Sequence, residues 1–408
     1  MDVIVKRCAG LDVHKRTVVA CVRIFSDGEV QREIRTFGTT TGELLELFDW
    51  LSDHDCTHVV MESTGVYWKP VWHILESGFE LVLANAKHVR NLPGRKTDVS
   101  DAVWLADLLA HGLIRGSFVP PLPIQDLRDL TRTRKQLRQE MSRHTLRIQK
   151  ILEDANIKLS GLVSDILGVS GRAVLQAIIA GESNPEALVA VTNGRLKADH
   201  DSLVAAARGT TRDHHRFLLN LHLKQIDEIR KTIASVEDHI ELVVKPFREH
   251  VERLVTIPGV SLIVALVILA EIGADMSRFP TVQNLISWAG LCPRSDESAG
   301  KHRSTRLKPG DPWLKTILVQ AAWAASRVKG SYLQAQFLRL KARRGPQKAI
   351  VAVAASILTA VYYMLRDHTN YVDLTANHFQ KRDKQRTADR LVRQLTALGY
   401  AVKLEAAA

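Results

Sequence analysis

Four acidic residues near the start of the chain lie in short motifs that could bind metal ions. Asp12 follows a β-rich run in Gly-Leu-Asp-Val-His-Lys, and Glu62 ends another run in Met-Glu-Ser-Thr-Gly. Asp98 and Asp101 are three residues apart in Lys-Thr-Asp-Val-Ser-Asp-Ala, a spacing that places two side chains on one helix face. Carboxylates bind hard cations such as Mg²⁺ or Mn²⁺, and two such ions promote phosphodiester cleavage. We therefore predict a metal-dependent catalytic site at these four acids.

The segments that carry these acids alternate between strand and helix patterns. Strand patterns cover residues 3–13, 17–25, 29–37, 58–61 and 80–84, and helix patterns cover 41–52, 66–77 and 98–111. Three strands in a meander, followed by alternating helices and strands, predict an α/β ribonuclease-H-like fold. Neighbouring parallel strands end at one edge of a sheet, so this fold would bring Asp12 and Glu62 together.

Other readings of the same residues remain open at this point. Asp98 could cap its helix, and Asp101 could be a first-turn acid favoured by the helix dipole. A phosphate loop of the sugar-kinase and actin type also has an aspartate after its first strand. Such a loop needs glycine next, whereas His14, Lys15 and Arg16 follow here, and this disfavours a kinase.

Composition and charge indicate a globular protein with a polyanionic partner. The 408 residues suffice for two or three domains, and 46% apolar with 25% charged residues exclude wholesale disorder. The net charge of +12 favours nucleic acid as the partner. The four cysteines are dispersed, so we expect reduced, buried thiols in a cytosolic protein rather than a disulfide scaffold or a zinc finger.

Hydrophobic patterning predicts no membrane partner. The N-terminal sequence lacks the long apolar core of a signal peptide. The apolar run at 349–365 is diluted by Ser356, Thr359 and five alanines, so we expect a buried helix there. These patterns predict a cytoplasmic protein.

Beyond a proline cluster at 120–123 the pattern becomes that of long helices. One apolar heptad seam runs through Leu127, Leu130, Leu137, Met141, Ile148, Ile151 and Ala155, and a second through Ile226, Ile229, Ile233, Val236, Ile240 and Val243. The two helices could form an intramolecular hairpin or a dimer contact. We predict a catalytic domain at 1–118, a helical coiled-coil region at 119–252 and a mainly α C-terminal domain at 253–408.

The C-terminal region adds two features that could contact nucleic acid. Residues 257–270 resemble a helix-hairpin-helix element, whose glycine-containing turn lets backbone N–H groups approach phosphate, although such segments are more often core. Basic residues also cluster in the helix at 128–150, where a solvated face is the simpler account, and in the tail at 381–393.

Motifs at both ends of the chain resemble the DEDD transposases of the insertion sequence 110 family. The N-terminal resemblance rests on the three acidic motifs, in that order. The C-terminal resemblance rests on Ile-Pro-Gly-Val from Ile257, Trp-Ala-Gly-Leu-Cys-Pro-Arg from Trp288, and Glu-Ser-Ala-Gly-Lys from Glu297. Several ordered motifs at compatible spacings make this resemblance specific.

The resemblance implies a RuvC-like metal site at Asp12, Glu62, Asp98 and Asp101, with a C-terminal serine that links covalently to DNA. Ser298 takes the position of that serine. The family pattern continues Ser-Gly, whereas this chain has Ser298-Ala299-Gly300, so Ser295 is the alternative. A hydroxyl needs a base or a metal to become a good nucleophile, and the carboxylate site of the other domain could supply it.

The resemblance also implies partners and a setting. Family members act as oligomers, so a homo-oligomer (dimer or tetramer) is expected in the bacterial cytoplasm, associated with the nucleoid. The expected partners are donor and target DNA and a structured guide RNA from the element itself. The basic residues expected to bind nucleic acid are Lys15, Lys87, Arg90, Arg95, Lys96, Arg294, Lys301, Arg303, Arg306 and Lys308. The alternatives are a RuvC-like nuclease without a covalent intermediate and a non-catalytic nucleic-acid-binding protein.

Overall fold

The computed structural model describes most of the chain as two compact units, Met1–Val119 and Pro120–Ala408. The described residues are 2–63, 65–85, 89, 100–114, 116–158, 163, 165–192, 199–293, 296–298, 301–304, 306–379 and 384–403. The boundary between the units lies one residue beyond the predicted end of the first domain at 118. The further division at residue 252 stays a prediction.

The first unit is built on a five-stranded mixed sheet. Its strands are β1 (Arg7–Val13), β2 (Thr17–Ser26), β3 (Glu29–Gly38), β4 (His58–Ser63) and β5 (Glu80–Leu83), in the order β3-β2-β1-β4-β5. Strand β1 pairs antiparallel with β2 and parallel with β4. This topology is compatible with the predicted ribonuclease-H-like fold.

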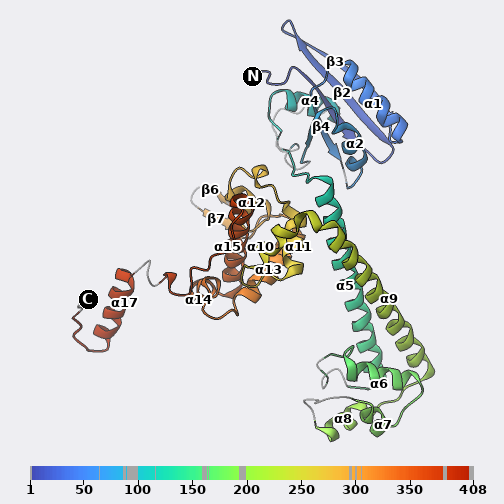
Figure 1. The fold of residues 1–408 in the computed structure, drawn as a ribbon, viewed down its shortest axis with the longest axis vertical. Helices are drawn as coiled ribbons and strands as arrows, with labels where there is room; N and C mark the ends of the chain where they lie inside the picture. Colours follow the sequence, from blue (N-terminus) through green and yellow to red (C-terminus); the bar gives the residue numbers. More distant parts are fainter. Residues whose placement is uncertain are drawn as a thin grey trace. The chain divides into compact units, whose positions relative to one another are not determined.

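Helices cover both faces of this sheet (Figure 1). Ala9, Leu11 and Val13 of β1 share a core with α1 (Thr41–Asp53) and α2 (Trp68–Leu75). Cys8 shares a core with α4 (Asp101–Ala110) on the opposite face. Side chains alternate along a strand, so the even-numbered residues of β1 face α4.

Two predicted element starts are wrong. The first strand begins at Arg7, because the backbone N–H groups of Ile4 and Val5 donate to the carbonyl of Ala110 at the end of α4 instead of joining the sheet. The last helix begins at Asp101, because Ser100 is its N-cap and accepts a hydrogen bond from the Val103 amide. The N-cap of this helix is therefore Ser100, and Asp98, which was expected on the same helix, lies outside the described residues.

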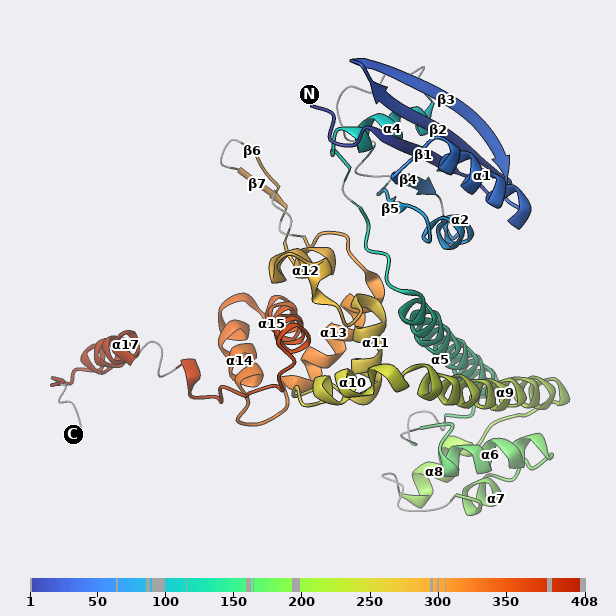
Figure 2. The same cartoon turned by 45° about the horizontal axis from the view of Figure 1, so that its top comes forward.

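Two long helices of the second unit form an antiparallel hairpin, α5 (Leu122–Asp154) and α9 (Asp213–Val243) (Figures 1 and 2). Three contacts fix their direction, because the partner's number falls as the residue number rises: Arg134 to Glu237, His144 to His222, and Asp154 to His215. Ile226, Ile233 and Ile240 are buried, whereas their heptad partners Ile229, Val236 and Val243 are only half-buried. The α5–α9 contact is thus made within one chain; supercoiling of the pair stays a prediction.

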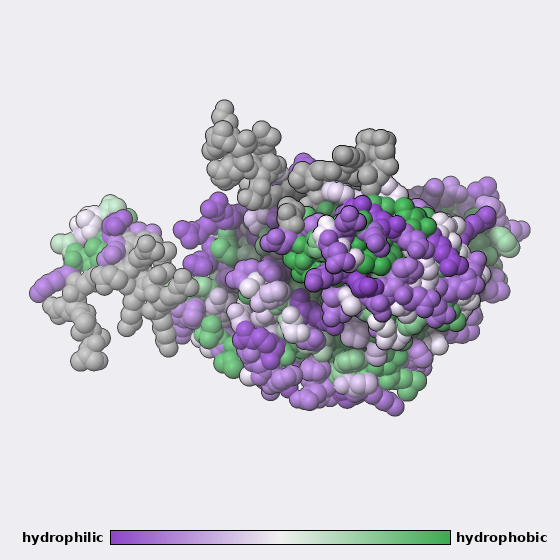
Figure 3. All heavy atoms as spheres, turned by 90° about the horizontal axis from the view of Figure 1, so that it is seen from above, coloured by the Kyte–Doolittle hydropathy of each residue, from purple (hydrophilic) through white to green (hydrophobic). Residues whose placement is uncertain are grey.

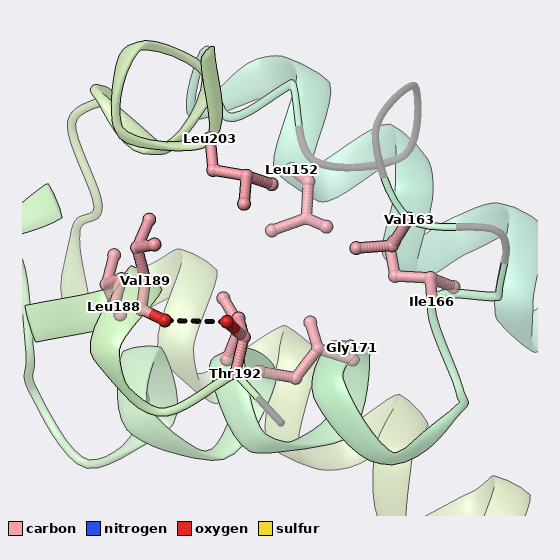
Figure 4. A pocket seen from close by; sticks show the side chains of 10 residues that line it. Leu152, Val163, Ile166, Gly171, Leu188, Val189, Thr192 and Leu203 are labelled. Carbon is pink, nitrogen blue, oxygen red and sulfur yellow. Dashed lines mark hydrogen bonds between the residues drawn. The ribbon is translucent and has the colours of Figure 1, made fainter. Parts of the chain in front are cut away.

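Three short helices close the far end of this hairpin. They are α6 (Val169–Ile179), α7 (Pro185–Ala190) and α8 (His200–Ala207), and they share one hydrophobic core with the ends of α5 and α9. The pocket drawn in Figure 4 lies inside this core, and its free volume is about 10 Å³. A single water needs roughly 10–15 Å³, so the pocket is a packing gap and no ligand site.

The remainder of the second unit is mainly helical, as predicted. Its elements are η2 (Lys245–Phe247), α10 (Arg248–Val255), α11 (Leu262–Ile272), η3 (Met276–Arg278), α12 (Val282–Trp288), β6 (Asp296–Ser298), β7 (Lys301–Ser304), α13 (Pro312–Ala325), α14 (Tyr332–Arg344), α15 (Pro346–Asp367) and α17 (Lys384–Ala397). By length and composition α15 could cross a membrane, yet it packs against α10, α12, α13 and α14. It is the buried helix that the apolar run predicted.

The surface of the molecule seen from above is largely hydrophilic (Figure 3). Hydrophobic patches lie between the hydrophilic side chains on this face. Scattered apolar residues of this kind are ordinary on protein surfaces and by themselves mark no site.

Candidate active site

Asp12 and Glu62 lie side by side at the carboxyl ends of two parallel strands. The register of β1 and β4 pairs Asp12 directly with Glu62. Both residues follow the alternation that turns Cys8 and Val60 toward α4, so both carboxylates lie on that face of the sheet. Each is partly exposed to solvent, with 23% of the Asp12 side chain accessible. The predicted meeting of these two acids at one sheet edge is therefore observed in the structure.

A glycine in β1 brings the third acid to the same edge. A Cβ atom on Gly10 would lie 2.2 Å from the Ala102 carbonyl oxygen and 2.6 Å from the Ala106 nitrogen, so only glycine permits this close approach of α4. Helix α4 runs antiparallel to β1, because its last residue meets Ile4 while its start packs near Val19, the β2 partner of Asp12. The exposed Asp101, which opens α4, therefore lies toward the Asp12 end of β1.

His14 is a member of this site that the sequence reasoning did not single out. Its Nε2 lies 3.1 Å from Asp12 Oδ2. The two-residue spacing along an extended strand was the available signal, because alternate side chains share a face. The Lys15 side chain is exposed in the turn that follows, where the Lys15 carbonyl accepts a hydrogen bond from Thr39 Oγ1.

The donor chemistry of this edge fits a hard divalent cation. Paired strands lie about 4.8 Å apart, so two carboxylates in register repel each other unless a cation lies between them. Among the residues that the structure describes, no group of three His, Cys, Asp or Glu side chains lies close enough together to hold a metal ion. Asp98, the fourth predicted ligand, lies outside that part of the chain. Asp12 and Glu62 are thus the two described carboxylates that could be the first ligands of a metal ion.

The cysteines of the first unit offer no alternative nucleophile. Burial raises the pKa of Cys8 and of Cys56 to about 12, and that of Cys21 to about 11. Only the thiolate is a strong nucleophile, so these thiols are unreactive at neutral pH. They serve as small apolar side chains within the core, as their dispersed positions predicted.

Ser298 is the last residue of the first strand in a two-stranded antiparallel pair. It ends β6 and pairs with Lys301, the first residue of β7. Backbone positions of the predicted nucleophile and of one predicted phosphate-binding lysine are therefore adjacent. Arg303 also lies on β7, while Arg306 and Lys308 are exposed on the returning segment.

The remaining predicted residues fall outside the described part of the chain. They are Ser295, Lys87, Arg90, Arg95, Lys96 and Arg294. Their assignment to nucleic-acid binding, or to nucleophilic attack for Ser295, stays a prediction.

The glycine of the predicted helix-hairpin-helix element serves internal packing. Gly259 has a φ of +86° in the turn between α10 and α11, and an added Cβ would lie 2.4 Å from the Ala325 nitrogen of α13. The absence of a side chain at Gly259 therefore permits close packing of this turn against α13. A helix–turn–helix arrangement is present, and a role in nucleic-acid binding stays a prediction.

Comparison with known proteins assigns both ends of the chain to one family. Residues 9–157 match the family described as Transposase, of the DEDD type of IS110. Residues 251–338 match the family described as Transposase IS116/IS110/IS902. Both matched regions are domains of the IS110 family of transposases. The first match includes Asp12, Glu62 and Asp101, and the second includes Ser298.

Individual relatives of this chain are named as transposases or as proteins of insertion elements. A transposase for insertion sequence element IS1111A from Coxiella burnetii is 30% identical over 173 residues, 41% of this chain and 47% of the relative. An uncharacterized 42 kDa protein of insertion element IS900 from Mycobacterium paratuberculosis is 25% identical over 330 residues, 71% of this chain and 80% of the relative. A mini-circle putative transposase for IS117 from Streptomyces coelicolor is 38% identical over 82 residues, 20% of this chain and 19% of the relative. This chain thus aligns with about half the length of the IS1111A transposase.

Proposed function

We propose that this protein is the transposase of an insertion sequence, a recombinase that cleaves and rejoins DNA strands with Mg²⁺ or Mn²⁺ and a covalent serine–DNA intermediate. The observation that carries the proposal is the pairing of Asp12 with Glu62 on the face of the sheet that also receives the start of α4. Transposase family models that match both ends of the chain, and a relative named as a transposase, support the same conclusion.

The carboxylates would bind a divalent cation and hold it in a fixed position. Asp12 and Glu62 would hold the cation, joined by Asp101 and by Asp98. Bound Mg²⁺ or Mn²⁺ supplies Lewis-acid activation of an attacking oxygen and neutralises phosphate charge. His14, through its contact with Asp12 Oδ2, would hold that carboxylate in one orientation.

Ser298 would make the bond to DNA. Its Oγ would bond to phosphorus while the phosphorus–oxygen bond to one deoxyribose breaks. The serine proton would pass to a base or to water, and the departing deoxyribose oxygen would take up one proton from a base or from water to become a hydroxyl. A deoxyribose hydroxyl freed in the same way on the other recombining strand would later attack this phosphorus and release Ser298. The number of phosphodiester bonds is conserved, so no energy-rich cofactor is required. Lys301 and Arg303, on the strand paired with Ser298, would neutralise phosphate charge.

Donor and target DNA are the proposed substrates, with a structured RNA from the element as the guide. The net charge of +12 supports polyanion binding, and binding of this kind weakens steeply as salt rises. In a homo-oligomer, the carboxylate site of one protomer would activate Ser298 of another protomer.

Two variants test the chemistry. Asp12→Ala should abolish strand cleavage, and Ser298→Ala should abolish both the protein–DNA adduct and recombination, while nucleic-acid binding persists in each. Mass spectrometry of a trapped, nuclease-trimmed complex should locate a nucleotide on Ser298, with Ser295→Ala as the matched control that keeps activity. Cleavage without any adduct would instead identify a RuvC-like nuclease, and normal cleavage by folded Asp12→Ala protein would refute the metal site.

A further inference from the structure

A buried ion network joins the first turns of α5 to α11 and α13. Glu271 of α11 has a fully buried side chain and receives a two-pronged contact from Arg132, with Nε to Oε1 at 2.8 Å and Nη2 to Oε2 at 2.7 Å. Arg132 Nη2 also reaches Asp311 Oδ2 at 3.4 Å. Arg128 adds hydrogen bonds to the carbonyl oxygens of Ala270 and Glu271 at the end of α11. We call Arg132, Glu271 and Asp311 the brace.

The brace ends beside the base of the segment that carries Ser298. Gly290 and Gly310 pack backbone to backbone, since a Cβ on Gly310 would lie 2.4 Å from the Gly290 nitrogen. The Lys308 amide donates to the Cys292 carbonyl at 3.1 Å just inside this contact. The chain thus leaves and returns at one point, which we call the neck, and Asp311 is the next residue after it.

Asp311 connects the brace to α13 as well as to the neck. Its Oδ1 accepts hydrogen bonds from the backbone amides of Trp313 at 2.7 Å and Leu314 at 2.9 Å, which caps α13. Arg132 lies over the Trp313 ring, 5.3 Å from its centroid. The Asp311 side chain therefore fixes the start of α13. Through its contact with Arg132, it also fixes the orientation of α13 against α5.

We propose that Arg132 and Glu271 are positioning residues, which hold the neck so that the hairpin carrying Ser298 keeps one orientation relative to α5. The proposal rests on the proposed role of Ser298 as nucleophile. Helix α5 begins three residues after the first unit ends at Val119, so it is the element that connects the carboxylate-bearing unit to this neck along the chain.

Chemistry favours positioning over simple stabilisation. A buried ion pair contributes little net stability relative to apolar side chains of similar volume, because desolvation offsets much of the attraction. The bidentate arginine–carboxylate contact instead restricts orientation. Burial raises the pKa of Glu271 despite its arginine partners, which is the expected sign of that desolvation. Apolar packing of similar volume is therefore expected to support the fold equally well, and the property that only the ion network supplies is a fixed geometry.

Two brace variants of the full-length protein, with its DNA and RNA bound, separate geometry from stability. Arg132→Lys keeps the positive charge but cannot make the two-pronged contact with Glu271. Arg132→Met combined with Glu271→Leu replaces the ion pair with apolar side chains. We expect both to form the Ser298 adduct about 100-fold more slowly at saturating DNA, the loss that a misplacement of about 1 Å produces. The half-saturating DNA concentration should not change, and the double variant should melt no lower than the parent protein.

A matched control removes a similar ion pair elsewhere on α5. Arg134 Nε lies 2.7 Å from Glu237 Oε1 within the hairpin, so Arg134→Met with Glu237→Leu should leave the adduct rate unchanged. Hydrogen exchange of the Lys308 amide gives a readout that needs no activity, and it should accelerate about tenfold in the brace variants alone.

Normal adduct formation and normal Lys308 exchange in the double brace variant would overturn the proposal. So would an adduct rate that recovers with the apolar pair, because that result would mean that the brace serves stability only. If the parent protein forms no adduct on Ser298, the proposed chemistry fails, and Lys308 exchange then decides by itself whether the brace holds the neck.

Discussion

Replacing Gly10 with alanine should separate α4 from the sheet and so disturb the acidic edge. The added Cβ would lie 2.2 Å from the Ala102 carbonyl oxygen, and ordinary contact begins at 3.4 Å, so α4 would have to move by about 1.2 Å. Overpacking of this kind costs about 1–3 kcal/mol of unfolding free energy. A displacement near 1 Å at Asp101 would also slow strand cleavage about 100-fold.

Chemical denaturation and a metal-dependent cleavage assay would measure the two effects on Gly10→Ala. Gly42→Ala is the matched control, because Gly42 lies in helix α1 with no atom near the position of an added Cβ. Alanine there should stabilise the protein by about 0.4–1 kcal/mol and leave cleavage unchanged. If Gly10→Ala matches the parent protein in both assays, then close packing of α4 on β1 does not position the site.

Three further changes test other parts of the structure. Ile233→Ala should lower the unfolding free energy of the helical hairpin by about 2–5 kcal/mol in urea titrations, because Ile233 is buried. Burial lowers the pKa of both His144 and His222, whose Nδ1 atoms lie 3.1 Å apart. Their contribution to stability is therefore present above pH 6.5 and lost as pH falls through the depressed values, and His222→Gln should flatten that dependence of the melting temperature. Gly259→Ala should lower the melting temperature, because its Cβ would meet the α13 backbone at a positive φ.

The acidic edge of the sheet was predictable because it depends on local patterns. Strand alternation and the acid at the end of each run predicted that Asp12 and Glu62 would meet, and the register confirms that they do. The buried helix α15 was predictable for the same reason, since its composition is uniform over many turns. Helix starts were less predictable, because Ser100, rather than the nearby acids, became the cap of α4.

Contacts between distant segments were not predictable from one sequence. No sequence pattern pairs Glu271 with a partner, and only the fold brings Arg132 from 139 positions away to its carboxylate. The hairpin around Ser298 was missed because its strands are only three and four residues long, with no alternating apolar pattern. The need for glycine at position 10 likewise comes from α4, which lies far along the chain.

The antiparallel course of α5 and α9 has a consequence for how such proteins can diverge. The chain departs along α5 and comes back along α9, so the far end of the pair is a detour between two points that lie close together. Equal numbers of turns could be gained or lost from both helices without displacing the segments at either end. The two family matches leave residues 158–250 unmatched, which contain the short helices at the far end and the whole of α9. Of the pair that could change length together, the first family match therefore includes α5. The returning helix α9 and the short helices before it lie where neither family match extends.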